Sequence, residues 1–394
     1  MKCWFASLTL CTALTTTQAL AFSMYEHKEI GDRGFATAWQ QFRTLAASVA
    51  ETLAKQQNVR VAKGGAEPAV KVAALAEGKA FAWFSMGDLV ALYGDWAGGY
   101  EELNHAKAVA RAPIWRRMLD EGAEVATDSE NARMMELAAV NTTHFAGTAL
   151  DTYLKWHRLA LEHAAKRGGL AEALHYEALA LHSYTDLFAA GHMLEERALT
   201  ERLLQWAKAK GSWLLAPLRK LAPIVLSKVW GLWANFYHNA FNTLGARVTN
   251  LDGESWRAYG DNKYRVVSAA CAQKSRAAQR LCEDPTTREQ RAILDAGVAR
   301  SVLAVLKTAA GRKLERGEAF SSLRKLPVGY AETQRPKAPG EQKLRILRML
   351  AKLGKAFIKR GFDFTLGILQ YEKKEYVGYV SYAEKVKANA AADR

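Results

Sequence analysis

The chain has 394 residues, of which 49% are hydrophobic, so it is long enough to bury a sizeable core, and disorder of the whole chain is excluded. Lys and Arg number 55 against 40 Asp and Glu, and the resulting charge of +15 favours acidic partners such as nucleic acid or an anionic membrane. The low content of 8 Pro and 28 Gly argues against a collagen-like or linker-rich chain.

The first residues have the pattern of an export signal. One early lysine is followed by an apolar run over residues 4–14 and then by Ala-Leu-Ala at 19–21, which is an A-x-A cleavage pattern. We therefore expect residues 1–21 to be a cleaved signal peptide, with an uncleaved anchor as the alternative. Cleavage would make Phe22 the mature terminus and the protein secreted or periplasmic.

The rest of the chain has mainly helical periodicity. Apolar residues recur at steps of three and four among charged residues, whereas long strand-like alternation is scarce. The segments that predict helices most clearly are 36–54, 149–166, 170–186 and 290–307. Gly and Asp residues predict loops near 63–69, 93–100, 121–131 and 249–262. We therefore expect an all-α protein.

A domain boundary is expected between Leu326 and Gly340, where a largely polar stretch contains several prolines. It separates a main domain, residues 22–326, from a C-terminal region, residues 327–394. In that region, residues 343–360 combine Lys and Arg with apolar residues and no acid, which predicts a basic amphipathic helix. This helix could lie on anionic lipid or pack on the main domain. A hairpin or a lipid-facing aromatic patch is expected at Tyr371, Tyr376, Tyr379 and Tyr382.

The strongest candidate for a functional site is an H-x3-D-x5-H motif formed by His182, Asp186 and His192. A spacing of four places His182 and Asp186 on one face of the predicted helix, and Gly191 can end the helix and turn His192 back toward them. Nitrogen and oxygen ligands in this arrangement suit zinc. The alternative is a hydrogen bond between His182 and Asp186 that only stabilises the helix. His175 shares the face and could compete.

Four further residues are weaker candidates when taken one at a time. His27 lies near the expected mature terminus, and Asp95, His144 and His238 follow it along the chain. A lone histidine is more often a satisfied core or surface residue, and Asp95 could cap a turn. Together with the motif, however, they form a series with a recognisable order.

This order resembles the all-α superfamily of zinc-dependent phospholipases C and fungal single-strand nucleases, most nearly its bacterial phospholipase branch. In that superfamily an N-terminal aromatic residue precedes a His, a loop Asp, a second His, the H-x3-D-x5-H motif, and a last His with an acidic residue four positions later. Phe22 stands five residues before His27, as the aromatic terminus does in the nucleases. The likeness covers residues 22–261, and segments 87–96 and 256–261 add to it outside the ligands.

The resemblance implies a phospholipase C-like catalytic domain with three zinc ions. It assigns one zinc to Asp95, His144 and His182. A second zinc would be bound by the terminus of Phe22 and by His27, with Asp186 bridging these two metals. The third would be bound by His192 and His238.

The chain departs from the family pattern at two positions. The carboxylate expected four residues after His238 is Asn242, so the third zinc should bind more weakly or recruit Glu195 or Glu196. The terminal aromatic residue is Phe22 instead of Trp, which matters less because only its backbone would bind metal. Asn242 is nevertheless included in the expected ligand set.

Clustered zinc ions lower the pKa of bound water and neutralise charge on a phosphoryl group, so the resemblance implies a phosphoric diester hydrolase with no covalent protein nucleophile. Asp95 is expected either as a general base toward water or as a ligand alone. The expected reaction is hydrolysis of glycerophospholipids to diacylglycerol and a phosphorylated headgroup.

Two segments favour lipid as the substrate. Residues 213–218 and 224–236 are apolar and aromatic and precede His238, so they could enter a membrane interface or form a buried core helix. Together with the basic C-terminal region, these two segments predict that the protein binds a phospholipid membrane surface. No obligate protein partner is expected. Two alternatives stay open: a secreted single-strand nuclease, whose phosphate backbone the positive charge would attract, and a non-catalytic membrane-binding protein with a degraded metal site.

Overall fold

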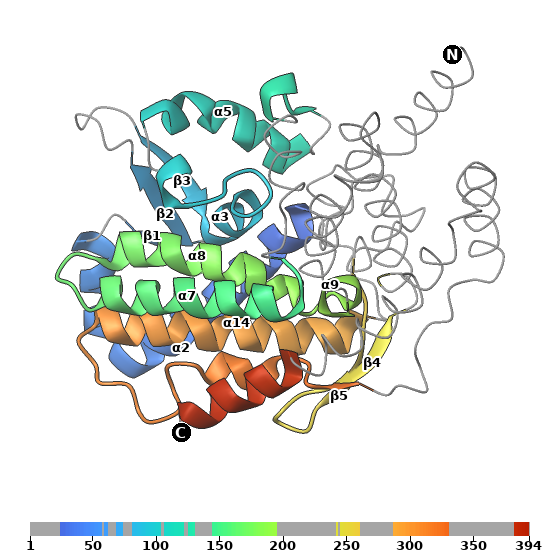
Figure 1. Cartoon of the computed structure of the whole chain (residues 1–394). Helices are drawn as coiled ribbons and strands as arrows, with labels where there is room; N and C mark the ends of the chain where they lie inside the picture. Colours follow the sequence, from blue (N-terminus) through green and yellow to red (C-terminus); the bar gives the residue numbers. More distant parts are fainter. Residues whose placement is uncertain are drawn as a thin grey trace, which may run out of the picture.

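A computed structural model describes most of the segments expected to form the main domain, and its helices dominate (Figure 1). The described residues are 24–56, 59–61, 68–73, 81–103, 106–121, 125–130, 144–194, 242, 245–260, 287–330 and 382–393. The expected signal peptide, the aromatic segments within 213–236 and the basic segment 343–360 lie outside this set.

The N-terminal part of the described chain combines a long helix with a small sheet. Helix α2 (Met24–Gln56) bends at Ala46, where the backbone leaves helical geometry. Strands β1 (Val59–Val61), β2 (Pro68–Ala73) and β3 (Phe81–Ser85) form an antiparallel sheet in that order. Helix α3 (Met86–Leu92) follows β3 directly, and helices α4 (Tyr100–Leu103) and α5 (Ala106–Glu121) come next.

A capping box explains why α3 begins where it does. The side chain of Ser85 accepts a hydrogen bond from Asp88 N, and the Asp88 carboxylate accepts one from Ser85 N. Lys28 of α2 and Arg116 of α5 both pair with this buried carboxylate, so Asp88 also ties α3 to two other helices.

Three long helices pack beside α2 to form the body of the molecule. Helices α7 (Ala146–Ala164) and α8 (Leu170–Asp186) form a hairpin, and α14 (Arg288–Ala309) lies against both of them and against α2 (Figure 1). The short helix α9 (Ala190–Leu194) follows α8 after a tight turn. The C-terminal end of α8 is therefore enclosed by other elements.

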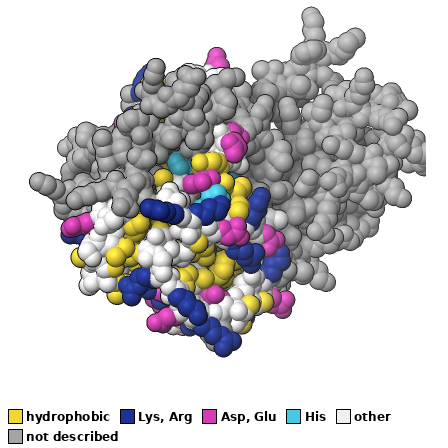
Figure 2. All heavy atoms as spheres, turned by 90° about the vertical axis from the view of Figure 1, so that its left-hand side faces the viewer, with side chains coloured by type: hydrophobic (Ala, Val, Ile, Leu, Met, Phe, Trp, Pro, Cys, Tyr) yellow, Lys and Arg dark blue, Asp and Glu magenta, His cyan; other side chains and the backbone are white. Residues whose placement is uncertain are grey.

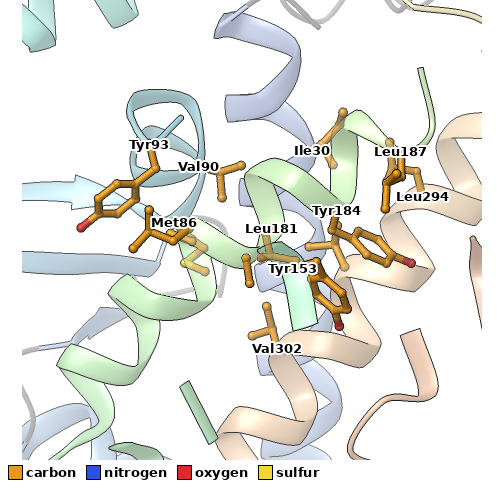
Figure 3. Packing of buried hydrophobic residues seen from close by; sticks show 14 of the residues in the cluster. Ile30, Met86, Val90, Tyr93, Tyr153, Leu181, Tyr184, Leu187, Leu294 and Val302 are labelled. Atoms are coloured by element: carbon orange, nitrogen blue, oxygen red, sulfur yellow. The ribbon is translucent and has the colours of Figure 1, made fainter. Parts of the chain in front are cut away.

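The core lies where these helices meet. Figure 3 shows Ile30 of α2, Val90 of α3, Leu181 of α8 and Val302 of α14, and all four are buried members of one hydrophobic cluster. The buried hydroxyl of Tyr153 is 2.9 Å from Ser301 Oγ and 2.5 Å from Ser322 Oγ, so this polar group is satisfied inside the core. The buried side chains of α8 are part of this core.

A second small sheet and a terminal helix close the other side. Strand β4 (Ala246–Thr249) pairs antiparallel with β5 (Ser255–Ala258) and with β6 (Gly329–Tyr330), which follows the 3-10 helix η4 (Ser321–Lys325). Residues 382–392 form a helix whose Tyr382 and Val386 are buried. Phe320 N donates to Asp393 Oδ2 at 2.7 Å, which ties the end of this helix to the body.

The helical predictions are confirmed at all four segments, which correspond to α2, α7, α8 and α14. The small sheets were not expected, and the predicted loop 249–262 is wrong in part, because it contains β5. Each strand of the β4–β5 hairpin has only four residues, too few for the alternation to stand out in the sequence.

The C-terminal predictions have a mixed outcome. The hairpin or lipid-facing patch is wrong for Tyr382, because this side chain is fully buried in a helix that packs on the body. The other three tyrosines and the basic segment lie outside the described residues. Strand β6 lies just after Leu326 and pairs with β4, while residues 331–381 are not described, so the domain boundary stays a prediction.

The described surface has no single sign of charge on the face shown in Figure 2, where Lys and Arg side chains are mixed with Asp and Glu. The net charge of +15 belongs to the whole chain. None of the described helices has the length and apolarity needed to span a bilayer.

Candidate metal centre

The candidate site lies around the C-terminal end of α8. This helix places His182 and Asp186 one turn apart on one face, as the spacing predicts. Residues from four other parts of the chain meet them there: His27 near the start of α2, Asp95 in the turn after α3, His144 just before α7, and His192 in α9.

Asp186 is at the centre of this site. Its Oδ2 lies 2.8 Å from His144 Nδ1 and 3.6 Å from His182 Nε2, and its Oδ1 lies 3.5 Å from His27 Nε2 and 3.9 Å from His192 Nδ1. The side chain is fully buried, yet neither oxygen receives a well-directed hydrogen bond from the described residues. A buried carboxylate in this state calls for a cation.

The nitrogen and oxygen atoms form overlapping groups of three buried donors. The groups are His27 with His182 and Asp186, Asp95 with His144 and His182, and His144 with Asp186 and His192, and the donor atoms of each group lie within 4.8 Å of one another. Ligands of a tetrahedral zinc-sized ion are roughly 3.3 Å apart, given metal bonds of about 2.0–2.2 Å. His182 Nε2 and His144 Nδ1 are 3.2 Å apart. These groups could therefore hold metal ions.

Hydrogen bonds set the ring orientation of three histidines. His182 Nδ1 donates to the carbonyl of Val90 at 2.8 Å, which leaves Nε2 as the lone-pair nitrogen toward Asp186. The hydroxyl of Thr185 donates to the carbonyl of His182, so it accepts from His27 Nδ1 at 2.8 Å, and His27 Nε2 likewise faces Asp186. His192 Nδ1 donates to the His144 carbonyl at 2.7 Å. Metal-binding histidines are commonly oriented in this way.

These orienting groups are the part of the site that sequence reasoning missed. Thr185 lies inside the H-x3-D-x5-H motif, and its spacing from His182 was the only feature of the sequence that could have indicated its role. The carbonyls of Val90 and His144 carry no side-chain signal at all. The alternative was a hydrogen bond between His182 and Asp186 along the helix. The structure gives no such bond, because His182 Nε2 lies 3.6 Å from Asp186 Oδ2, and Nδ1 of the same ring donates to Val90.

A glycine turn brings Asp95 to the site. Gly94 has a φ of +87°, and its N–H donates to the carbonyl of Ala97 at 2.8 Å, which closes the turn after α3. A side chain at position 94 would overlap the His182 ring, so Gly94 also makes room for that ring. Asp95 is buried, and its Oδ2 has no hydrogen-bond partner among the described residues.

Burial dominates the electrostatics of the site. Burial lowers the pKa of His27 well below its ordinary value, and the unfavourable interaction of a charged His27 with His182 and His144 lowers it further. Burial also lowers the pKa of His182 to about 4. Burial raises the pKa of Asp186 to about 7, against the pull of His182, and together with Asp186 it raises the pKa of Asp95. The protein alone thus disfavours charge on every one of these groups, and a bound cation would offset that cost for the carboxylates.

The remaining predicted residues lie elsewhere. Phe22, His238, Glu195 and Glu196 are outside the described residues, so their predicted roles stay predictions. His175 does not compete for the site in the described groups, because its Nδ1 bonds the hydroxyl of Tyr93 at 2.9 Å. Asn242 is buried, and its side-chain oxygen accepts a hydrogen bond from Gly191 N at 2.7 Å.

Comparisons with protein-family models, with curated proteins and with solved structures find no significant match for this chain.

Proposed function

We propose that this protein is a zinc-dependent phosphoric diester hydrolase of the phospholipase C type. The observation that carries the proposal is the environment of Asp186, a buried carboxylate approached within 3.9 Å by histidines from four parts of the chain. The chain order of these residues, which resembles that of the zinc-dependent phospholipases C, supports the same conclusion.

The donor chemistry supports zinc as the metal. The described groups offer imidazole nitrogens and carboxylate oxygens, which are borderline and hard ligands that zinc accepts in tetrahedral sites. His182 and His27 already present their Nε2 atoms toward Asp186, because their Nδ1 protons are held by Val90 and Thr185. Zinc ions in such a centre supply Lewis-acid activation of water and neutralise charge on the phosphoryl group.

Asp95 is the residue proposed to move a proton. Its carboxylate lies in one donor group with His144 and His182, and its Oδ2 has no hydrogen-bond partner among the described residues. An unbonded carboxylate oxygen can accept a proton from a water molecule or bind metal directly. The donor atoms of Asp95 and His182 lie within 4.8 Å of each other, and the Asp95 side chain is buried.

The proposed substrate is a glycerophospholipid, cleaved to diacylglycerol and a phosphorylated headgroup. This choice comes from the sequence: the aromatic segments within 213–236 and the basic segment 343–360 suit a lipid surface, and both lie outside the described residues. The same metal chemistry would also cleave a nucleic-acid backbone, so the substrate has to be tested directly.

One experiment tests the proposal. The mature chain beginning at Phe22 is purified, its zinc is counted by elemental mass spectrometry, and the same sample is assayed on phosphatidylcholine vesicles and on single-stranded DNA. The expected result is about three zinc ions per chain together with lipid hydrolysis. Cleavage of DNA alone would replace the phospholipase with a nuclease. Little zinc and no turnover of either substrate would overturn both enzymes and favour a non-catalytic membrane-binding protein.

A further inference from the structure

Asn242 stands close to the metal centre but makes contacts of a different kind from those of the histidines. Its side chain is buried, and its Oδ1 accepts a hydrogen bond from Gly191 N at 2.7 Å. Its backbone carbonyl accepts a second one from Gly260 N at 3.2 Å. Asn242 thus joins the start of α9 to the end of the β4–β5 hairpin.

The bond to Gly191 meets a need that every helix has. The first N–H groups of a helix find no acceptor within the helix itself, and α9 begins at Ala190. His192 N and Met193 N both bond to the carbonyl of Ala189, whereas Gly191 N bonds to the side chain of Asn242. Asn242 therefore acts as an N-cap that is supplied from a distant part of the chain.

The amide oxygen is also enclosed. A side chain on Gly260 would overlap the Asn242 amide, so the backbone of Gly260 lies directly against it. Gly191 N–H occupies another side of the same oxygen. A zinc ligand must approach its ion to about 2.0–2.2 Å. The bond from Gly191 N takes one lone pair of this oxygen and the backbone of Gly260 lies against the amide, so a zinc ion would have to displace one of these contacts.

The cap also determines the position of His192, because His192 follows Gly191 in the chain. The His192 ring is held by a hydrogen bond to the His144 carbonyl and stacks on Phe145 with ring centroids 4.2 Å apart. Both contacts require α9 to start where Asn242 anchors it. We propose that Asn242 is a positioning residue that holds α9, and with it His192, and that it is not a metal ligand. This inference rests on the proposed metal centre.

Amide hydrogen exchange of Gly191 in the zinc-loaded chain tests the inference, because this N–H stays protected only while the Asn242 oxygen caps α9. With glycine labelled by nitrogen-15, exchange at Gly191 should be slowed on the order of 100-fold relative to an open amide. Replacement by Ala (N242A) should abolish the protection and lower zinc affinity about 10-fold, whereas N242D, which keeps an acceptor oxygen, should retain the protection.

N250A is the matched control. Asn250 is also buried, and its side-chain oxygen accepts from Asp252 N and Glu254 N, both at 3.0 Å, in the β4–β5 turn. This variant should lose stability while its zinc affinity and Gly191 protection stay at the wild-type level. If N250A lowered zinc affinity as much as N242A does, the effect of N242A would be general destabilisation and the inference would be wrong.

Fast exchange at Gly191 in the zinc-loaded wild-type chain would also overturn the inference, since it would show that the Asn242 oxygen is bound elsewhere. Failure of the proposed function has a different signature. A chain that binds zinc, protects Gly191 and hydrolyses no phosphodiester would retain the positioning role and lose only the phospholipase.

Discussion

Helix α8 buries two carboxylates, Glu177 and Asp186, and surrounds them differently. Glu177 Oε2 lies 2.6 Å from His157 Nδ1, and Glu177 Oε1 accepts from the hydroxyl of Ser301 at 2.5 Å. Asp186 has histidine nitrogens nearby but no well-directed hydrogen bond from the described residues. Both carboxylates are fully buried, so burial alone does not distinguish them.

The difference lies in whether the protein itself completes the network. His157 Nε2 donates to the carbonyl of Ala319 at 2.8 Å, so both ring nitrogens face acceptors, and Glu177 raises the pKa of His157, which favours the doubly protonated ring. The resulting imidazolium compensates the charge of Glu177, and this cluster is complete without a ligand. Around Asp186, His182 and His27 turn lone-pair nitrogens inward, because their Nδ1 protons are bonded to Val90 and Thr185. A buried hydrogen-bond network with all its groups paired stabilises the fold, whereas a buried carboxylate that still needs a cation indicates a metal-binding site.

The largest effect is expected from replacing Asp186 with Asn. The variant D186N keeps the size of the side chain but loses the charge shared by two of the donor groups. Bound zinc should fall sharply and hydrolysis should drop on the order of 10²–10³-fold, because the metals stabilise the charge that develops in the reaction. Elemental analysis and a vesicle assay on one sample measure both. Unchanged zinc with normal turnover would refute the central role of Asp186.

The matched change at the other carboxylate should have the opposite result. The variant E177Q leaves the buried imidazolium of His157 without its counter-charge, so the free energy of unfolding should fall by about 3 kcal/mol. Zinc content should stay the same, because Glu177 belongs to none of the described donor groups. Urea denaturation measures the loss. A chain as stable as the wild type would contradict the ion-pair interpretation of this cluster.

A pair of glycine variants separates backbone strain from crowding at the site. Gly94 and Gly168 have similar φ values of +87° and +81°, but only at position 94 would a methyl group overlap the His182 ring. Both Ala variants should cost roughly 1–2 kcal/mol of stability because of the left-handed backbone. Only G94A should also weaken zinc binding. Equal zinc affinity in the two variants would show that the His182 ring adjusts without loss.

The smallest expected effect is a pH dependence of stability that comes from His157. Burial by itself would lower the pKa of His157, but the charge and hydrogen bond of Glu177 outweigh it and raise the pKa above 6.5. At pH values between 6.5 and the raised pKa of His157, the folded chain holds a proton that the unfolded chain has released. The free energy of unfolding should therefore fall as pH rises from 6.5 through the folded pKa.

Urea denaturation across this pH range checks the expected slope. The E177Q variant provides the control, because the raised pKa depends on Glu177 and the slope should disappear with it. A slope of equal size in E177Q would assign the pH dependence to another group.

The sequence alone was sufficient for four long helices and for the linear part of the site. Periodicity identified α2, α7, α8 and α14, because each is long enough for the helical repeat to exceed chance. A spacing of four residues was enough to place His182 and Asp186 on one face, since helix geometry leaves no other arrangement.

Only the tertiary structure decided how the remaining residues meet this face. His27, Asp95 and His144 approach Asp186 from separate elements, and their convergence depends on packing between helices that no local pattern encodes. The nitrogen that each ring presents depends on backbone carbonyls such as that of Val90, which every residue possesses and which composition therefore cannot reveal. For the same reason the cap formed by Asn242 on α9 became visible only in the folded chain.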